Sequence, residues 1–355
     1  MFLYKSMRSK RKKKSKETSE RKKKTSIPAA GQKKEESKRN KTKASKETAD
    51  GVSRAVPAPP PKNDFPGEAV AKKWMTAPTL TLDAISKEFG QVSSAKPAAA
   101  KCPRFQANLP KSRATDCPIA DDKLVKLSHA PEGFICAAKL TVPEFKRTAL
   151  VAQVPDVTKA PMLEDFWRMI FQEEIVSIVL AVMPMECQVS LQQLLPIANG
   201  TFANHGKMFL NNKKVESSVG MTAYTLELLP DGCSNSVNTT VYHLLNWKQK
   251  KGADNIGELV NTIEKVVKLN ENVAFVSMNG TGRAGTMLCV FAGMQLINKS
   301  VDVKMKEILE KLRAERSGLV ENAEQYVAVH KAIATWIKTK SKDELIAKKA
   351  KELGV

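Results

Sequence analysis

The chain has 355 residues, enough for one large domain or two small ones, and a formal net charge of +21. Residues 1–50 contribute +13 of this charge with 19 Lys/Arg and 6 Asp/Glu, so the basic excess is mainly terminal. The six cysteines include no C-x-x-C pair and the four histidines are isolated, which argues against a zinc site, a disulfide framework and any metal or other cofactor. Reduced thiols, and the lack of an apolar run of membrane-spanning length, favour a cytoplasmic or nuclear protein.

Residues 1–65 are predicted to form a disordered tail, because Lys, Arg, Ser, Thr and Glu dominate and a short proline run is extended. Two basic runs, 11–14 and 21–24, are typical of a nuclear address or of a contact with a polyanion. The alternative is a solvated tail that only aids solubility. Aromatic residues are not interleaved with the basic ones, so stacking on nucleic-acid bases is not indicated.

Apolar spacing after the tail predicts an alternation of helices and strands. Thr81 is a candidate cap for the first helix. The predicted helices are 82–89, 165–170, 256–267, 305–312 and 326–336, and the predicted strands are 175–182, 221–229 and 239–247, the last two joined by a turn at 230–232.

The stretch 272–297 combines a short buried strand, a glycine-rich loop and an apolar helix. Glycines at 280, 282 and 285 let backbone N–H groups turn inward, and the N-terminus of the helix adds its positive dipole end. Arg283 lies in the loop, and its planar guanidinium fits two phosphate oxygens. The stretch therefore predicts a site for an anion.

Three interpretations compete for this loop. The three glycines spell the dinucleotide pattern G-x-G-x-x-G, but too little chain follows for a doubly wound sheet. A phosphate-binding P-loop fails because Thr286 stands where its lysine belongs. In the third interpretation, the five residues between Ser277 and Arg283 resemble the signature H-C-S-A-G-x-G-R-T-G of the protein tyrosine phosphatase family. The glycines and the arginine match, whereas Val276 replaces the histidine and Ser277 the cysteine.

Other segments resemble the same family in the same order. The most specific is Asp165–Ile170, close to D-F-W-R-M-V. The others are 111–127, 133–138, 149–155, 242–249 and 313–326. The resemblance covers residues 80–340, and the remaining residues 341–355 are predicted to form a polar tail. Within the family, the chain most resembles small nematode phosphatase-domain proteins with basic N-terminal tails. It implies a single α/β domain with a twisted mixed sheet flanked by helices.

The resemblance also implies which residues form the site. The phosphate-binding residues would be Ser277, Met278, Asn279, Gly280, Thr281, Gly282 and Arg283. Ala114 and Asp116 would stand at substrate-recognition positions, Ala114 in place of a tyrosine that stacks on the substrate ring. Gln249 takes the place of the general-acid aspartate, and Glu321 that of the glutamine that positions water.

These replacements predict a catalytically inactive homologue that acts as a phosphotyrosine-binding or protein-interaction module in signalling, because serine lacks an activated thiolate and glutamine is not an acid. Its partner would be a phosphotyrosine protein or another signalling protein. Two alternatives stay open: residual phosphatase activity by an unusual route, and a nucleic-acid binder driven by the basic tail with an inert domain. The loop itself would then be a purely structural turn.

Overall fold

The computed structural model describes residues 65–94, 96–130, 133–187 and 190–355. The predicted basic tail, 1–65, lies almost wholly outside these residues, and so does its predicted contact with a polyanion. The α-helices are α1 (Glu68–Met75), α2 (Leu82–Gln91), α3 (Pro103–Ala107), α4 (Ala160–Gln172), α5 (Ile256–Leu269), α6 (Gly282–Asn298), α7 (Met305–Glu315), α8 (Ala323–Lys340) and α9 (Glu344–Glu352). Short 3-10 helices cover Ala99–Lys101, Leu109–Lys111, Pro184–Cys187 and Leu191–Gln193.

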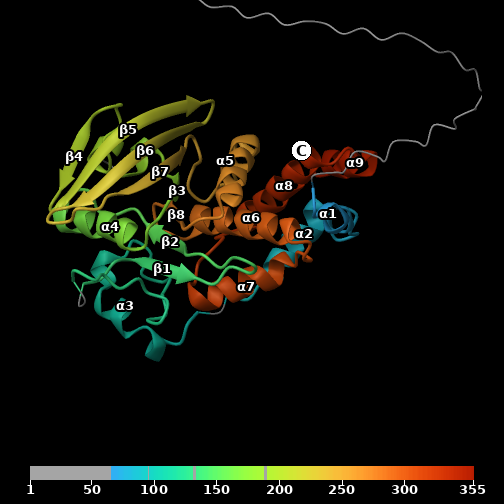
Figure 1. Cartoon of the computed structure of the whole chain (residues 1–355). Helices are drawn as coiled ribbons and strands as arrows, with labels where there is room; N and C mark the ends of the chain where they lie inside the picture. The colour runs from blue at the N-terminus through green and yellow to red at the C-terminus, as the bar shows by residue number, and fades with distance from the viewer. Residues whose placement is uncertain (1–64, 95, 131–132, 188–189) are drawn as a thin grey trace, which may run out of the picture. The chain divides into compact units, whose positions relative to one another are not determined.

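One sheet of eight strands organises the described part of the chain (Figure 1). Its order is β1-β2-β8-β3-β7-β6-β5-β4. The strands are β1 (Ala137–Leu140), β2 (Ala149–Gln153), β3 (Ser177–Ala181), β4 (Phe202–His205), β5 (Met208–Ser218), β6 (Met221–Pro230), β7 (Val237–Leu244) and β8 (Val273–Ser277). The pairs β2–β8, β8–β3 and β3–β7 are parallel and the others antiparallel. The predicted mixed α/β sheet is confirmed.

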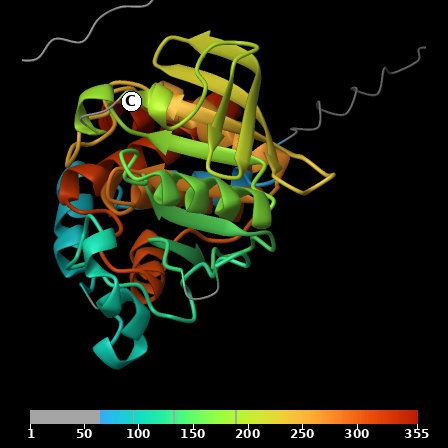
Figure 2. The ribbon, with the colours of Figure 1, turned by 90° about the vertical axis from the view of Figure 1, so that its left-hand side faces the viewer.

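Helices cover both faces of the sheet, as Figure 2 shows from the side. Helix α4 packs on one face, where Phe166, Trp167 and Ile170 join the cluster that includes Val276 of β8. Helices α5, α6 and α7 belong to the cluster on the other face, together with Phe275. Alternate residues of β8 thus enter opposite cores, and the whole strand is buried.

Helix α6 runs through the core, and residues 282–297 are all buried. A helix that is apolar on every side is stable only when other elements surround it. Small residues allow close packing: a Cβ added at Gly293 would lie 2.4 Å from Cδ1 of Ile333 on α8. The helix that follows the glycine loop is therefore enclosed by the core along residues 282–297.

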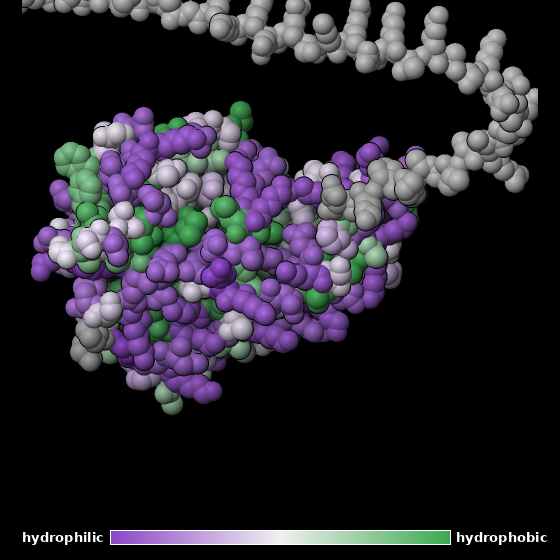
Figure 3. Space-filling view, in the orientation of Figure 1, coloured by the Kyte–Doolittle hydropathy of each residue, from purple (hydrophilic) through white to green (hydrophobic). Residues whose placement is uncertain are grey.

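The two ends of the described domain differ from the expected boundaries. Helix α1 lies before residue 80 and packs beside α9, with an ion pair of 2.6 Å between Lys72 and Asp343. The predicted polar tail at 341–355 contains α9, whose Ile346 and Ala350 are buried. Their spacing places them on one face, which docks on the domain. The face shown in Figure 3 is mostly hydrophilic, as expected for a folded unit whose apolar residues are inside.

Candidate functional site

The glycine-rich loop begins at the centre of the sheet. Ser277 is the last residue of β8 and pairs in register with Gln153 of β2 on one side and Ala181 of β3 on the other. Its side chain is buried. Ligands of open α/β sheets bind outside the carboxyl ends of parallel strands, and Ser277 lies at that edge.

Two glycines of the loop are required by geometry. Gly280 has φ +61°, and a Cβ there would lie 2.5 Å from the backbone N of Gln153. A Cβ at Gly285 would lie 2.6 Å from the backbone N of Val320. Both contacts are far shorter than a carbon atom tolerates, so the turn and its packing alone account for these two residues.

Arg283 is held by a carboxylate and a carbonyl of the protein. Its Nη1 and Nη2 donate to Glu186 Oε1 and Oε2 at 3.0 and 2.6 Å, and Nη1 also donates to the carbonyl of Trp247 at 2.6 Å. The side chain is only 3% exposed. This bidentate arrangement is the strong form of a carboxylate–arginine pair. An incoming anion must therefore share a guanidinium that already has a carboxylate partner.

Glu321 places a second carboxylate at the loop. The hydroxyl of Thr281 donates to Glu321 Oε1 at 3.0 Å. A Cβ at Gly282 would lie 2.2 Å from Glu321 Oε2, so the carboxylate rests on the N-terminus of α6. A negative charge is stabilised there by the helix dipole. The protein thus supplies its own carboxylate at the end of α6 that was predicted to hold a phosphate.

A small cavity remains in front of Ser277. It measures about 20 Å³, room for about one water molecule. Its lining among the described residues contains no cysteine, histidine or aspartate. The lining consists of Gln249, Lys250, Ser277, Met278, Asn279, Thr281, Gly282, Arg283 and Glu321. The structure thus brings together every predicted phosphate-binding residue except Gly280, and adds the other two predicted degenerate positions, Gln249 and Glu321.

The two predicted substrate-recognition residues line a separate, larger cavity of about 380 Å³ next to the first. Asn279, Lys250 and Glu321 belong to both cavities. Ala114 is buried in the wall of the larger one and Asp116 lies at its exposed part. The small side chain of Ala114 fills little of this space.

Two thiols lie near the loop without lining the small cavity. Cys136 is buried, with Sγ 3.6 Å from Ser112 Oγ and 3.9 Å from Nη2 of Arg316. Arg316 in turn donates to the carbonyl of Gly280 at 2.7 Å. Cys117 lines the larger cavity, and burial together with the neighbouring Asp116 raises the pKa of its thiol to about 11. That thiol is protonated at neutral pH.

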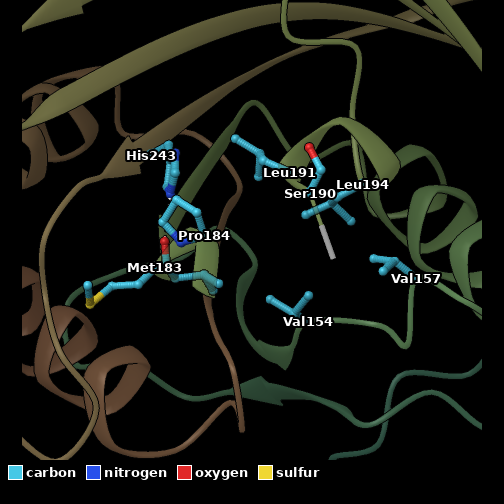
Figure 4. A pocket seen from close by; sticks show the side chains of 9 residues that line it. Val154, Val157, Met183, Pro184, Ser190, Leu191, Leu194 and His243 are labelled. Carbon is cyan, nitrogen blue, oxygen red and sulfur yellow. Dashed lines mark hydrogen bonds between the residues drawn. The ribbon is translucent and has the colours of Figure 1, made fainter. Parts of the chain in front are cut away.

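A third cavity, drawn in Figure 4, lies beside the segment that carries Glu186. Val154, Met183 and Leu194 contribute to its largely apolar wall. His243 lines it too, and its Nε2 donates to the carbonyl of Val182 at 2.7 Å. Burial lowers the pKa of this histidine, so it is neutral at pH 7. A volume of about 20 Å³ and an apolar wall do not favour a polar ligand.

The family model described as protein-tyrosine phosphatase matches residues 108–335. The chain belongs to the protein-tyrosine phosphatase family. A Caenorhabditis elegans protein named "Putative tyrosine-protein phosphatase C15H7.3" is 52% identical to this phosphatase-family chain over 285 residues, covering 80% of the chain and 71% of the relative. Human "Tyrosine-protein phosphatase non-receptor type 2" is 25% identical over 260 residues, covering 70% of the chain and 61% of the relative. The predicted family and its nematode type are confirmed.

The fold of this phosphatase domain matches a solved structure described as the structural basis of the PTPN18 fingerprint on distinct HER2 tyrosine phosphorylation sites. The TM-score is 0.65 at 18% identity, covering 76% of the chain and 99% of that structure. At this identity the match supports the fold. Among the described residues, no helix is long and apolar enough to cross a membrane.

No pattern in the sequence of this family member predicts Glu186 as the carboxylate partner of Arg283. A single acidic residue in a short 3-10 helix, 97 positions before its partner, gives no local signal. The basic environment of the larger cavity gives no local signal either, because its described lining is assembled from five segments distant in sequence.

Proposed function

We propose that this chain is a catalytically inactive member of the protein-tyrosine phosphatase family, acting as a phosphotyrosine-binding or protein-interaction module in signalling. The observation that carries the proposal is the composition of the small cavity. Ser277 lies at its floor beside Arg283, and its lining among the described residues offers no thiol and no histidine.

A serine in this position is a weak nucleophile. The family reaction, as the resemblance implies, needs a thiolate whose pKa is lowered by the helix N-terminus and the arginine. A hydroxyl ionises many units higher, and loop dipoles shift a pKa by only a few units. A serine nucleophile therefore needs an adjacent base. Among the described residues that line the cavity, Glu321 is the only carboxylate, and it accepts a hydrogen bond from Thr281 instead.

The other two parts of the reaction are also replaced. Gln249 lines the cavity at the general-acid position, and a carboxamide is far too weak an acid to protonate a leaving phenolate. Glu321 stands at the water-positioning place, where its charge repels a phosphate. Loss of nucleophile, acid and water-positioning residue together supports the absence of turnover.

Cys136 lies near the loop, and a cysteine in that place is an alternative candidate for the nucleophile. It lines a different cavity of about 10 Å³, together with Phe134 and Phe166. Its sulfur contacts Arg316, whose Nε holds the carbonyl of Gly280. We infer that Cys136 supports the loop as a packed side chain rather than attacking a substrate.

Binding of a phosphate remains compatible with the loop, because Arg283 and the N-terminus of α6 are in place. The cavity of about 20 Å³ is too small for a phosphate as it stands. The Glu321 side chain must therefore swing away from Gly282 when phosphotyrosine enters. The ordering cost of this movement lowers the expected affinity.

Calorimetric titration of the full chain with a phosphotyrosine peptide tests the proposal. A phosphoserine peptide of the same sequence controls for charge attraction by the basic N-terminal segment. We expect tighter binding of the phosphotyrosine peptide and at least a tenfold loss in the Arg283→Lys variant, which keeps the charge but not the planar fork. Equal binding of both peptides, unchanged in the variant, would exclude a role for the loop.

A further inference from the structure

A cavity of about 320 Å³ is lined by residues of α1, α2, α8 and the start of α7. It shares no lining residue with either cavity at the glycine-rich loop. Its volume falls within the range of small-molecule sites, ~300–1,000 Å³. Its walls differ in chemistry, because α2 and α8 contribute hydrogen-bond acceptors whereas the start of α7 contributes lysines.

The wall formed by α8 carries a buried nitrogen without a hydrogen-bond donor. His330 lines the cavity and is 5% exposed, and its Nδ1 donates to the carbonyl of Tyr326 at 3.0 Å. Burial lowers the pKa of this imidazole, so at neutral pH its single proton is on Nδ1 and Nε2 is an acceptor. No described residue donates to Nε2. A buried acceptor without a partner is costly, so a ligand that donates a hydrogen bond here is favoured.

A carboxylate on α2 supplies a second acceptor. Glu88 Oε1 accepts from the hydroxyl of Tyr326 at 2.5 Å, and Oε2 accepts from no described residue. The charge of Glu88 acts on the pKa of His330, opposing the effect of burial, so the two groups are neighbours. An amino group has two hydrogens and therefore matches this pair of acceptors.

The indole of Trp74 on α1 provides a flat apolar surface beside these acceptors. It is half-buried and stacks on the imidazole of His330, with ring centroids 5.9 Å apart and an interplanar angle of 15°. Leu80 and Ile85 extend the apolar wall. Nucleobases stack on aromatic side chains. A planar heteroaromatic ring that carries an amino group thus fits both the acceptors and the apolar wall.

The start of α7 is suited to a phosphate. The first N–H groups of a helix have no partner within it, and the N-cap residue Lys304 makes no side-chain capping hydrogen bond. Lys304 pairs with Glu307 at 3.0 Å, whereas Lys306 forms no ion pair with any described residue. A helix N-terminus with a lysine beside it is a favourable site for a phosphate group.

We propose that this cavity binds an adenine nucleotide. The amino group of the base donates to Glu88 and His330, and the ring lies against Trp74. The phosphate lies at Lys306 and the N-terminus of α7. Adenine is favoured over guanine because guanine presents a carbonyl oxygen at the equivalent ring position, which would face the two acceptors. The site goes beyond the proposed phosphotyrosine function and does not require it.

Calorimetric titration of the full chain with adenosine monophosphate tests the proposal. Purine riboside 5′-phosphate lacks only the amino group and is the matched ligand. We expect it to bind roughly tenfold more weakly or worse, because both acceptors then lose their donor. This comparison separates recognition of the base from attraction of the phosphate to a basic chain.

Three variants assign the two ends of the nucleotide. Lys306→Gln should weaken both ligands roughly tenfold and preserve the preference for the amino group, because both ligands carry the phosphate. Glu88→Gln keeps an oxygen for the Tyr326 hydroxyl but loses the carboxylate, so it should weaken adenosine monophosphate alone and reduce the preference. Lys311→Gln, exposed on the same helix and outside the cavity, is the control and should stay within about twofold.

No binding of adenosine monophosphate, or equal binding of the two ligands, would overturn the proposal. Equal losses in Lys306→Gln and Lys311→Gln would also overturn it and assign the attraction to net charge. Binding unchanged in both Lys306→Gln and Glu88→Gln would place the nucleotide outside this cavity. Because Arg283 does not line this cavity, its variant tests the proposed phosphotyrosine site separately.

Discussion

Arg283 and Glu186 form a bidentate ion pair, with Nη2–Oε2 and Nη1–Oε1 distances of 2.6 and 3.0 Å. The pair joins the start of α6 to the segment after β3, 97 residues earlier in the chain. The carbonyl of Trp247, after β7, completes the arrangement. Three loops at the carboxyl ends of parallel strands are thus fixed around one guanidinium.

Glu186→Ala should destabilise the folded chain by ~3–5 kcal/mol, because it leaves a buried guanidinium without its carboxylate. Urea unfolding followed by tryptophan fluorescence measures the change. Glu216→Ala is the matched control, since Glu216 forms an exposed pair with Lys214 at 2.9 Å and should change stability by about 0–1 kcal/mol. Equal effects of the two substitutions would show that the Arg283 pair contributes no more than a surface contact.

Glu321→Gln should strengthen binding of a phosphotyrosine peptide. The substitution removes the negative charge from the N-terminus of α6 and preserves an oxygen for the Thr281 hydroxyl. We expect roughly a tenfold gain in affinity, which calorimetry measures. Glu344→Gln, on the exposed first turn of α9, controls for the change in net charge. An affinity unchanged or lowered by Glu321→Gln would contradict the assignment of Glu321 as a barrier.

Gly280→Ala should lower the thermal stability of the chain strongly. The added methyl group would clash with the backbone of Gln153 at 2.5 Å, in a left-handed conformation that alanine disfavours. Gly90→Ala offers a contrast within α2, because nothing lies within 4 Å of its added carbon. Helix propensity predicts that it stabilises by up to ~1 kcal/mol. The interpretation of the loop fails if both variants unfold at the wild-type temperature.

Cys117 should react slowly with iodoacetamide at pH 8. Burial and Asp116 raise the pKa of its thiol to about 11, so the reactive thiolate is scarce below that pH. Its labelling rate should rise about tenfold per pH unit until the pH nears this pKa. Peptide mapping by mass spectrometry compares it with the exposed Cys233. Labelling of Cys117 as fast as Cys233 at pH 8 would show that the cavity does not hold the thiol protonated.

Much of the fold could be predicted from local patterns in the sequence. Helix α2 begins at Leu82, and Thr81 accepts from the backbone N–H of Ala84 as its predicted cap. The buried strand, glycine loop and apolar helix at 273–297 are present as predicted. In each case the prediction depends on residues that are close in sequence. The spacing of apolar residues predicts the helix or strand, and a capping residue predicts where the helix begins.

The remaining features depend on contacts between distant segments. Strand β5 mixes buried Met208 and Leu210 with exposed lysines, so its sequence lacks a sustained alternation. Helix α9 carries its signal in the spacing of Ile346, Ala350 and Leu353, which the many lysines around them obscured. The Glu186–Arg283 pair and the larger cavity next to the loop form only when the folded sheet brings distant segments together.

The most direct test of the central claim is a phosphatase assay of the full chain with p-nitrophenyl phosphate, beside its Arg283→Lys and Cys136→Ser variants. Absence of an activated nucleophile at Ser277 predicts no turnover above the uncatalysed rate in any of the three. Turnover by the unmodified chain that disappears in Arg283→Lys would contradict an inactive loop. If turnover disappeared in Cys136→Ser instead, Cys136 would be the nucleophile, and the account of the loop as a binding site without catalysis would be wrong.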